Sequence, residues 1–422
     1  GTFAWESPGW REFLRGLTTE VRDNSEYITL DDMHPNYKRV YGIVAGQVLR
    51  RIVDFPTDRE ARRLFGLLPR LLLVDRRKTR FTHGSRVNMF MERVRQVVAL
   101  RDLPRLLEVR AVSTRTRVSS VKTDERTRAD VLKSTRLGQY SRAGSMAMSA
   151  EVARSNASAE RVVEGLYPQA ALPSTVHLPD PEDRVCLDRR IFMHVVGADG
   201  DGRVKIGSAA DSAGHRWEHI EWMVDAGAAE DLYTVCNRLW LGYMQEDDDD
   251  DWSWIFNAKL VLLIKKDNER TRRHDYGEGD LRPIAPGSIL LRLISGVGAR
   301  HVGPEFARLF DPGCAEDADN SEVAPVVQAG AAMKGAAEQV QHSAQELLAR
   351  RPQACILLVD GEMAFQLVNR GTFLEFQHRH RMATYMWCKR CYGKRTRIYM
   401  RREDGSLRSF DRTGGTSQGG PL

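Results

Sequence analysis

The stretch ILLVDGEMAFQLVNR occupies residues 356–370, in the second half of the chain. An apolar run, Ile356–Val359, leads directly into a single acid, Asp360, and Phe365 follows five residues later. A short apolar run of this kind predicts a buried strand, so Asp360 would stand at the end of a rigid core element. A carboxylate in that position suits a metal ligand. The alternative is an aspartate that caps the next helix, and the stretch alone leaves both open.

The segments around this strand alternate between strand and helix patterns. In chain order we expect a strand in the last part of 252–266, an extended start and then a helix over 281–302, a helix over 331–351, a mostly helical segment over 369–393 and a β-hairpin over 396–410. The pair Asp404-Gly405 is typical of a type I′ turn in that hairpin. This order indicates an α/β or α+β fold.

The first part of the chain is expected to be basic and mainly helical. Residues 59–73 show helical spacing interrupted by Pro69, residues 87–100 read as an amphipathic helix, and residues 144–168 contain one or two further helices. A proline-rich stretch, 168–183, is the best candidate for a domain boundary. We therefore predict a helical region over 1–175 and a second domain over 176–422.

Positive charge is concentrated in one block of the first region. Residues 76–142 contain 18 Lys and Arg against 6 Asp and Glu, whereas the whole chain has a net charge of +6. Such a block suits a polyanion, and nucleic acid is the usual one. The alternative is a solvated, partly flexible segment.

The composition of the chain bears on its redox environment and on membrane association. Six cysteines in 422 residues are too few for a disulfide scaffold, which indicates a reducing, intracellular environment. No apolar run approaches the roughly 20 residues of a membrane span, so no membrane partner is expected. The chain begins without Met and breaks off within a motif at GGTSQGGPL, so we expect a fragment.

Two tempting metal motifs are better explained in other ways. The acidic run EDDDDD at 246–251 is expected to be a solvated loop, because adjacent carboxylates repel one another and point in different directions. Cys388 and Cys391, with His378 and His380 upstream, have a spacing too short for four zinc ligands to converge from one helix.

Four blocks in the second half resemble the reverse transcriptase domain of non-LTR retroelements, in that family's order. They are LVLLIKK followed by LRPI (260–266 and 281–284), VVQAGAAMKGAAEQVQHSAQELL (326–348), VDGEMAFQLVNR (359–370) and CYGKRTRIYM…GGTSQGGPL (391–422). Each block alone is weak, but the four together in order are a much stronger signal. The resemblance covers roughly residues 240–422. It implies polymerase fingers followed by an incomplete right-hand palm.

The resemblance implies specific roles for the residues that contact the nucleotide. Lys265 and Arg282 would bind the triphosphate of the incoming nucleotide, and Lys266 is the alternative to Lys265. Phe365 would lie beneath the sugar and exclude a 2′-hydroxyl; the alternative for this residue is a simple core position. Gln418 would contact the nucleotide and the template base pair, and Gly419 would let the backbone approach closely.

The family's chemistry also implies a two-metal magnesium site. Asp360 would be the first carboxylate ligand, and the carbonyl oxygen of Gly361 would add another oxygen. The family's second palm motif consists of an aromatic residue, a variable residue and two aspartates, and it should follow Gln-Gly-x-Pro-Leu. The sequence ends with Gln-Gly-x-Pro-Leu at Leu422, so it does not contain the second motif. Gln366 and Gly420 also depart from the family's usual residues. We therefore expect this chain alone to have little or no polymerase activity.

The expected function is thus RNA-directed DNA polymerase of a retrotransposon, as an incomplete or inactive fragment. Its partners would be an RNA template, a DNA primer and deoxynucleoside triphosphates, with Mg²⁺ as cofactor and a nuclear location that follows from a chromosomal substrate. The alternatives are a non-catalytic RNA-binding remnant, or a maturase-like or telomerase-like polymerase. Sequence leaves the oligomeric state open.

Overall fold

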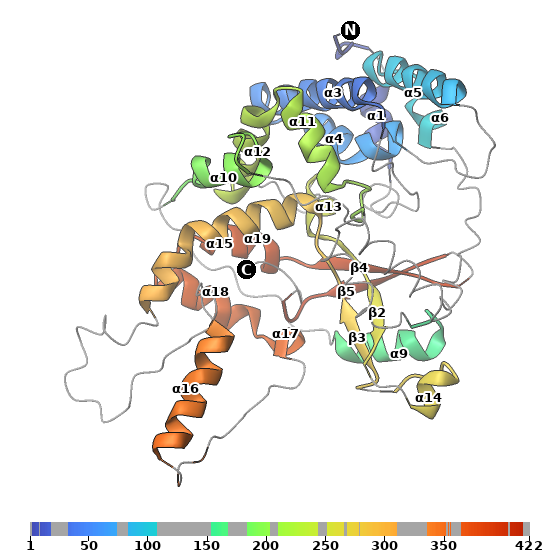
Figure 1. Cartoon of the computed structure of the whole chain (residues 1–422). Helices are drawn as coiled ribbons and strands as arrows, with labels where there is room; N and C mark the ends of the chain where they lie inside the picture. The colour runs from blue at the N-terminus through green and yellow to red at the C-terminus, as the bar shows by residue number, and fades with distance from the viewer. Residues whose placement is uncertain are drawn as a thin grey trace.

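The computed structural model shows a mixed helix-and-strand protein (Figure 1). It describes residues 2–7, 9–17, 33–73, 83–107, 153–167, 184–202, 210–243, 251–265, 268–277, 279–309, 336–351, 353, 355, 364–403 and 406–416. Within these residues no helix is both long and apolar enough to span a membrane.

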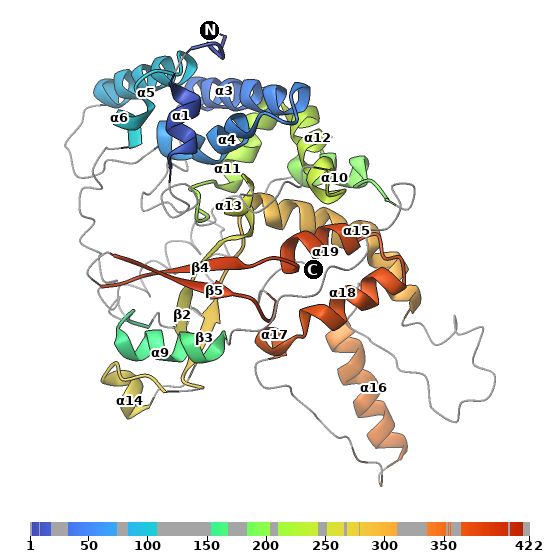
Figure 2. The ribbon, with the colours of Figure 1, turned by 180° about the vertical axis from the view of Figure 1, so that it is seen from behind.

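A group of helices forms one side of the molecule. Its members are α1 (Trp10–Arg15), α3 (Pro35–Asp54), α4 (Arg59–Leu72), α5 (His83–Val98), α6 (Leu103–Leu107), α10 (Arg189–Val196), α11 (Trp217–Asp225), α12 (Ala229–Trp240) and α13 (Ser253–Phe256). Figure 1 and the reverse view in Figure 2 both place this group above the strands. The helix predicted over 87–100 is confirmed by α5.

Local sequence explains where α4 begins and how it ends. The side chain of Asp58 accepts a hydrogen bond from the Ala61 backbone N–H at 3.1 Å and caps α4. The predicted interruption at Pro69 is wrong, because α4 continues to Leu72. Pro69 lies in the last turn of the helix, where a missing N–H and a displaced carbonyl disturb few further bonds.

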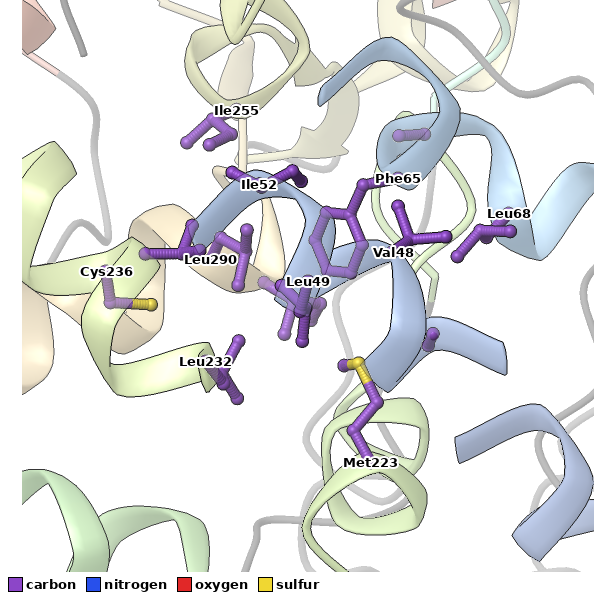
Figure 3. Packing of buried hydrophobic residues seen from close by; sticks show 14 of the residues in the cluster. Val48, Leu49, Ile52, Phe65, Leu68, Met223, Leu232, Cys236, Ile255 and Leu290 are labelled. Atoms are coloured by element: carbon purple, nitrogen blue, oxygen red, sulfur yellow. The ribbon is translucent and has the colours of Figure 1, made fainter. Parts of the chain in front are cut away.

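A large apolar core holds the helical group together. Val48, Leu49 and Ile52 of α3 pack with Phe65 of α4 and Leu290, which comes from a distant part of the chain (Figure 3). This core takes buried residues from 3–106, 187–297 and 374–392. It therefore joins segments from both sides of the boundary expected at 168–183, a stretch that lies outside the described residues.

Two small sheets lie beside the helical group. In one sheet the strand order is β1 (Ala258–Lys259), β4 (Thr396–Arg401), β5 (Leu407–Arg412); β1 runs parallel to β4, and β4 is antiparallel to β5. In the other, β2 (Val261–Ile264) pairs antiparallel with β3 (Leu281–Ile284). The strands predicted near 260–264 and 281–284 and the hairpin over 396–410 are confirmed.

A second apolar core lies between these sheets and the helix α9 (Ala157–Leu166). It contains Val163 and Leu166 of α9 together with Leu262, Ile398 and Phe410 of the strands. Two ion pairs add to this contact, because Arg402 donates to Glu160 at 2.6 and 2.9 Å and Arg408 to Glu164 at 3.2 Å. Residues 153–167 thus pack with β2 and β3, about 100 residues later in the sequence, and with β4 and β5, about 240 residues later.

The remaining helices lie in the second half of the chain. They are α14 (Glu269–Arg272), α15 (Ile289–Leu309), α16 (Ala336–Arg350), α17 (Ala364–Leu367), α18 (Arg370–Arg379) and α19 (Tyr385–Tyr392). The helices expected within 281–302, 331–351 and 369–393 are confirmed. The strand expected at 356–359 falls outside the described residues.

The turn signal Asp404-Gly405 of the β4–β5 hairpin lies outside the described residues. In the described part of the hairpin, Arg401 pairs with Leu407, and the Arg402 N–H donates to the Ser406 carbonyl at 2.8 Å.

The last residue of the acidic run, Asp251, does not lie in the solvated loop that the sequence predicted. The Asp251 side chain is fully buried and accepts hydrogen bonds from Arg63 at 2.7 Å and from Arg59 at 2.8 Å. Asp251 is therefore a buried ion-pair partner of α4 and no part of a solvated loop, while residues 246–250 lie outside the described part of the chain.

Candidate nucleotide-binding site

The hairpin formed by β2 and β3 places Lys265 and Arg282 on one face. Leu263 pairs with Arg282, and Lys265 lies two residues after Leu263, with its N–H donating to the Asp280 carbonyl at 2.7 Å. Because side chains alternate across a strand, Lys265 and Arg282 project to the same side as diagonal neighbours. Both side chains are exposed. The hairpin therefore presents two cations together to solvent.

The opposite face of the hairpin fixes it to the protein. Leu262 and Leu281 lie on that face and are 2% and 4% exposed in the second core. Burial of side chains of this size contributes roughly 1.5–3 kcal/mol each. The two cations are thus carried by strands whose other face is anchored.

A hydrogen-bonded turn closes the hairpin beside Lys265. The Asp280 carboxylate accepts from the Asn268 side-chain amide at 3.1 Å and from the Gly277 N–H at 2.9 Å. Asn268 also caps α14 by accepting from the Thr271 N–H at 2.9 Å. These bonds hold Asp280 in place, and Asp280 in turn holds the backbone of Lys265.

Phe365 is presented to solvent from the short helix α17. Its side chain is 48% exposed, which argues against the core position that the sequence left as the alternative. The Thr416 N–H donates to the Phe365 carbonyl at 2.6 Å, and the Gly415 N–H donates to the Val368 carbonyl at 3.2 Å. The segment that leads into Gln418 is therefore bonded to the segment that carries Phe365.

Glycine is required at position 415 of this contact. Gly415 has φ of +63°, and an added Cβ would lie 2.4 Å from the Gln366 carbonyl oxygen. Only a residue without a Cβ allows the two segments to approach this closely.

Arg370 is the last residue of the block VDGEMAFQLVNR, and the structure shows what its side chain contacts. It is 3% exposed and donates to four carbonyl oxygens: Gly415 at 2.7 Å, Lys394 and Arg412 at 3.3 Å, and Tyr392 at 3.4 Å. Burial, followed by the like charge of Arg412, lowers the pKa of Arg370. No sequence signal could identify these acceptors, because they are main-chain groups from later segments.

The remaining predicted site residues are not described. Asp360, Gly361, Gln418, Gly419 and the alternative Lys266 all lie outside the described residues. Among the residues that are described, no group of three His, Cys, Asp or Glu side chains is placed to hold a metal ion. The magnesium site at Asp360 and Gly361 therefore stays a prediction.

The Cys388 and Cys391 pair belongs to the packing of α19. Both thiols are buried, and burial raises the pKa of each, so neither is poised as a thiolate ligand. The His378 ring instead packs edge-on against Tyr385 with ring centroids 5.0 Å apart.

Comparison with known proteins adds no assignment. No protein family model matches the chain, and no curated protein matches it.

Proposed function

We propose that the chain is the fingers and part of the palm of an RNA-directed DNA polymerase of the non-LTR retroelement type, with a helical region before it. The observation that carries this proposal is the register of β2 and β3, which brings Lys265 and Arg282 to one exposed face. A triphosphate needs several cationic donors on one side, and guanidinium groups bind phosphate oxygens in a two-pronged fashion.

The contact between Phe365 and Thr416 supports the same proposal from another direction. In the proposed site Phe365 contacts the sugar of the incoming deoxynucleotide, and Gln418 and Gly419 contact its base pair with the template. The bond from Thr416 to Phe365 fixes the chain two residues before Gln418. The sugar and base contacts would then lie on neighbouring segments.

The metal-dependent part of the proposal rests on sequence. Mg²⁺ held at Asp360 and Gly361 would supply the activation of the primer hydroxyl. The partners are an RNA template, a DNA primer and deoxynucleoside triphosphates. The basic block at 76–142 would contribute to RNA binding, and the location would be nuclear.

Primer extension tests the proposal. The chain is incubated with an RNA template, a labelled DNA primer, the four deoxynucleotides and Mg²⁺, beside the variants Asp360→Ala and Arg273→Ala. Arg273 is an exposed cation directly after α14 and serves as the control for a surface substitution. The proposal expects any extension to be lost in Asp360→Ala and retained in Arg273→Ala.

RNA-binding measurements on the same protein distinguish the proposed polymerase from the alternative, a non-catalytic RNA-binding remnant. Salt-dependent RNA binding that is unaffected by every deoxynucleotide supports the remnant and counts against the enzyme. Synthesis that survives in Asp360→Ala contradicts the assigned metal ligand.

A further inference from the structure

A cavity of about 460 Å³ opens between α9 and the turn that follows α14. Figures 1 and 2 both show these two helices side by side. Pockets that hold small molecules have volumes of roughly 300–1,000 Å³, so this cavity has room for a small ligand. The lining residues come from two stretches of chain, with Arg161, Val162, Gly165 and Leu166 on one side and Arg270, Asp275, Tyr276 and Gly277 on the other.

The cavity lies on the opposite side of the β2–β3 hairpin from Lys265 and Arg282. Those two cations project from the exposed face of the hairpin. On the other face, Leu262 and Leu281 pack in one core with Leu166 of α9, which also lines the cavity. A ligand in the cavity would therefore not occupy the proposed nucleotide-binding site, and the two sites can be tested separately.

Hydrogen bonds fix the two walls of the cavity to each other. The Asn156 side-chain amide donates to the His274 carbonyl at 2.7 Å. The Tyr276 N–H donates to the Ser158 hydroxyl at 3.1 Å, and the Tyr276 hydroxyl accepts from the Arg154 N–H at 2.9 Å. Tyr276 itself is buried. The cavity is thus formed before any ligand binds, which reduces the ordering that binding would require.

Two exposed arginines belong to the lining. Among the residues that the structure describes, Arg161 has no hydrogen-bond or ion-pair partner. The Nε of Arg270 lies 3.8 Å from the Asp275 carboxylate, and its guanidinium covers Gly277 so closely that a Cβ there would lie 2.9–3.1 Å from it. The position of Arg270 is therefore defined. With two positive charges and one negative charge, the lining favours an anionic ligand.

The rest of the lining is largely apolar. Leu166 and Tyr276 are buried in the second core, and Val162 packs against it. Gly165 leaves open space over this surface, because a Cβ built there would meet no atom within 4 Å outside its own stretch of helix. A planar ring could therefore lie against α9 at this position.

We propose that the cavity binds a nucleoside phosphate, with the phosphate held by Arg161 and Arg270 and the base lying over Gly165. Guanidinium groups bind phosphate oxygens through paired hydrogen bonds, and a base is a planar ring that can cover an apolar surface. Inorganic phosphate would leave the apolar lining uncovered, and a nucleoside alone would leave the arginines without an anion. The choice of ligand rests on the lining of the cavity and not on polymerase activity.

Titration calorimetry of the full chain with adenosine monophosphate tests the proposal. Gly165→Met places a long side chain in the cavity, and Gly296→Met is the matched control, because a Cβ at Gly296 of α15 also meets no atom within 4 Å. We expect Gly165→Met to weaken binding by at least about tenfold and Gly296→Met to leave it unchanged. Both variants replace a helical glycine by a better helix former, so the melting temperature should not fall. Unchanged binding in Gly165→Met, or no binding by the parent chain, overturns the proposal.

Arginine variants test the phosphate contact separately. Arg161→Gln and Arg270→Gln should each weaken the binding of adenosine monophosphate about tenfold. Arg190→Gln, which changes an exposed cation on α10, should not. These surface substitutions decide the question if Gly165→Met lowers the melting temperature. Binding that neither variant of a lining arginine changes, or displacement of the nucleotide by inorganic phosphate at equal concentration, overturns the assignment of a nucleoside phosphate.

A free nucleotide and one unit of a nucleic-acid strand present the same groups, and competition with oligoadenylate distinguishes the two sources. Oligoadenylate that displaces adenosine monophosphate assigns the cavity to a strand. Oligoadenylate that does not displace it assigns the cavity to a free nucleotide. Either result is consistent with the proposed ligand chemistry.

The same measurements separate this proposal from the proposed polymerase. Binding of adenosine monophosphate should persist in Arg282→Ala, because Arg282 lies on the other face of the β2–β3 hairpin. Loss of binding in Arg282→Ala places the nucleotide on the hairpin and overturns the assignment to the cavity. If the nucleotide binds in the cavity and no deoxynucleotide is retained on a template, the polymerase function fails alone.

Discussion

The Arg370 side chain donates a hydrogen bond from Nε to the carbonyl oxygen of Gly415 at 2.7 Å, across 45 residues of chain. This bond ties the start of α18 to the segment that reaches Phe365. The guanidinium is buried and bonded to three further carbonyls, so one side chain at the start of α18 holds together the ends of β5 and α19. The site around Phe365 therefore depends on Arg370 for its shape.

Replacement of Arg370 should destabilise the chain strongly. Arg370→Ala removes the donors of several buried carbonyls, and we expect the free energy of unfolding to fall by about 3 kcal/mol. Arg370→Lys keeps the charge but has no forked donor group, so it should lose most of the same stability. Urea denaturation measures both. An Arg370→Ala variant as stable as the parent chain contradicts this role.

The buried carboxylate of Asp251 should be a second point of vulnerability. Asp251→Asn removes the negative charge that faces Arg59 and the buried Arg62 and Arg63. Breaking a buried ion pair from one side costs about 3–5 kcal/mol, because the other charge is left uncompensated. The exposed Glu375→Gln is the matched control and should change stability by less than about 0.5 kcal/mol. Urea denaturation measures the free energy of unfolding of both variants, and equal values for the two contradict the role of Asp251.

The free energy of unfolding should fall in acid because Asp58 and Glu60, which bond to Arg11, become protonated. Burial alone would raise the pKa of Asp58, but hydrogen bonds from Arg11 and Arg51 outweigh it and hold that pKa below its ordinary value. Glu60, which bonds to Arg15 and Arg11, behaves in the same way. A carboxylate with a lowered folded pKa contributes stability above its ordinary pKa, near pH 4, and loses it as pH falls further.

The variant Arg11→Gln checks this sign. It removes contacts of 3.1 Å to both Asp58 oxygens and of 3.0 Å to Glu60. Between about pH 6 and pH 3, the parent chain should lose more free energy of unfolding than Arg11→Gln does. Equal losses in the two proteins show that these carboxylates do not set the acid limit.

Sugar discrimination should depend on Phe365. Its exposed ring leaves Phe365→Ala with nearly unchanged stability, while the proposed clash with a 2′-hydroxyl would disappear. We expect the preference for a deoxynucleotide over the matching ribonucleotide to fall by roughly tenfold. Phe376→Ala, which removes another exposed ring on α18, is the control. Competition binding with the two nucleotides measures the ratio, and an unchanged ratio assigns Phe365 no part in sugar contact.

Local patterns predicted most helices and strands because those elements follow from residues close in sequence. The period of apolar residues identified α5, α15 and α16, and Arg-Pro marked the extended start at β3. The resemblance singled out Lys265 and Arg282, but their position on one face of the β2–β3 hairpin came only from the structure.

Long-range pairing accounts for what the sequence could not show. Asp251 is buried because arginines of α4, almost 190 residues earlier, meet it in the core. The acceptors of Arg370 are main-chain carbonyls. Every residue has such a group, so no residue type in the sequence identifies them.

Selective retention of a nucleotide on a template is the most direct test of the central claim. The chain is bound to an RNA template with a chain-terminated DNA primer in the presence of Mg²⁺, and the retention of each labelled deoxynucleotide is measured. The proposed polymerase retains the deoxynucleotide complementary to the next template base, and Arg282→Ala weakens that retention by about tenfold. Equal retention of all four deoxynucleotides, or retention that ignores Arg282, contradicts it.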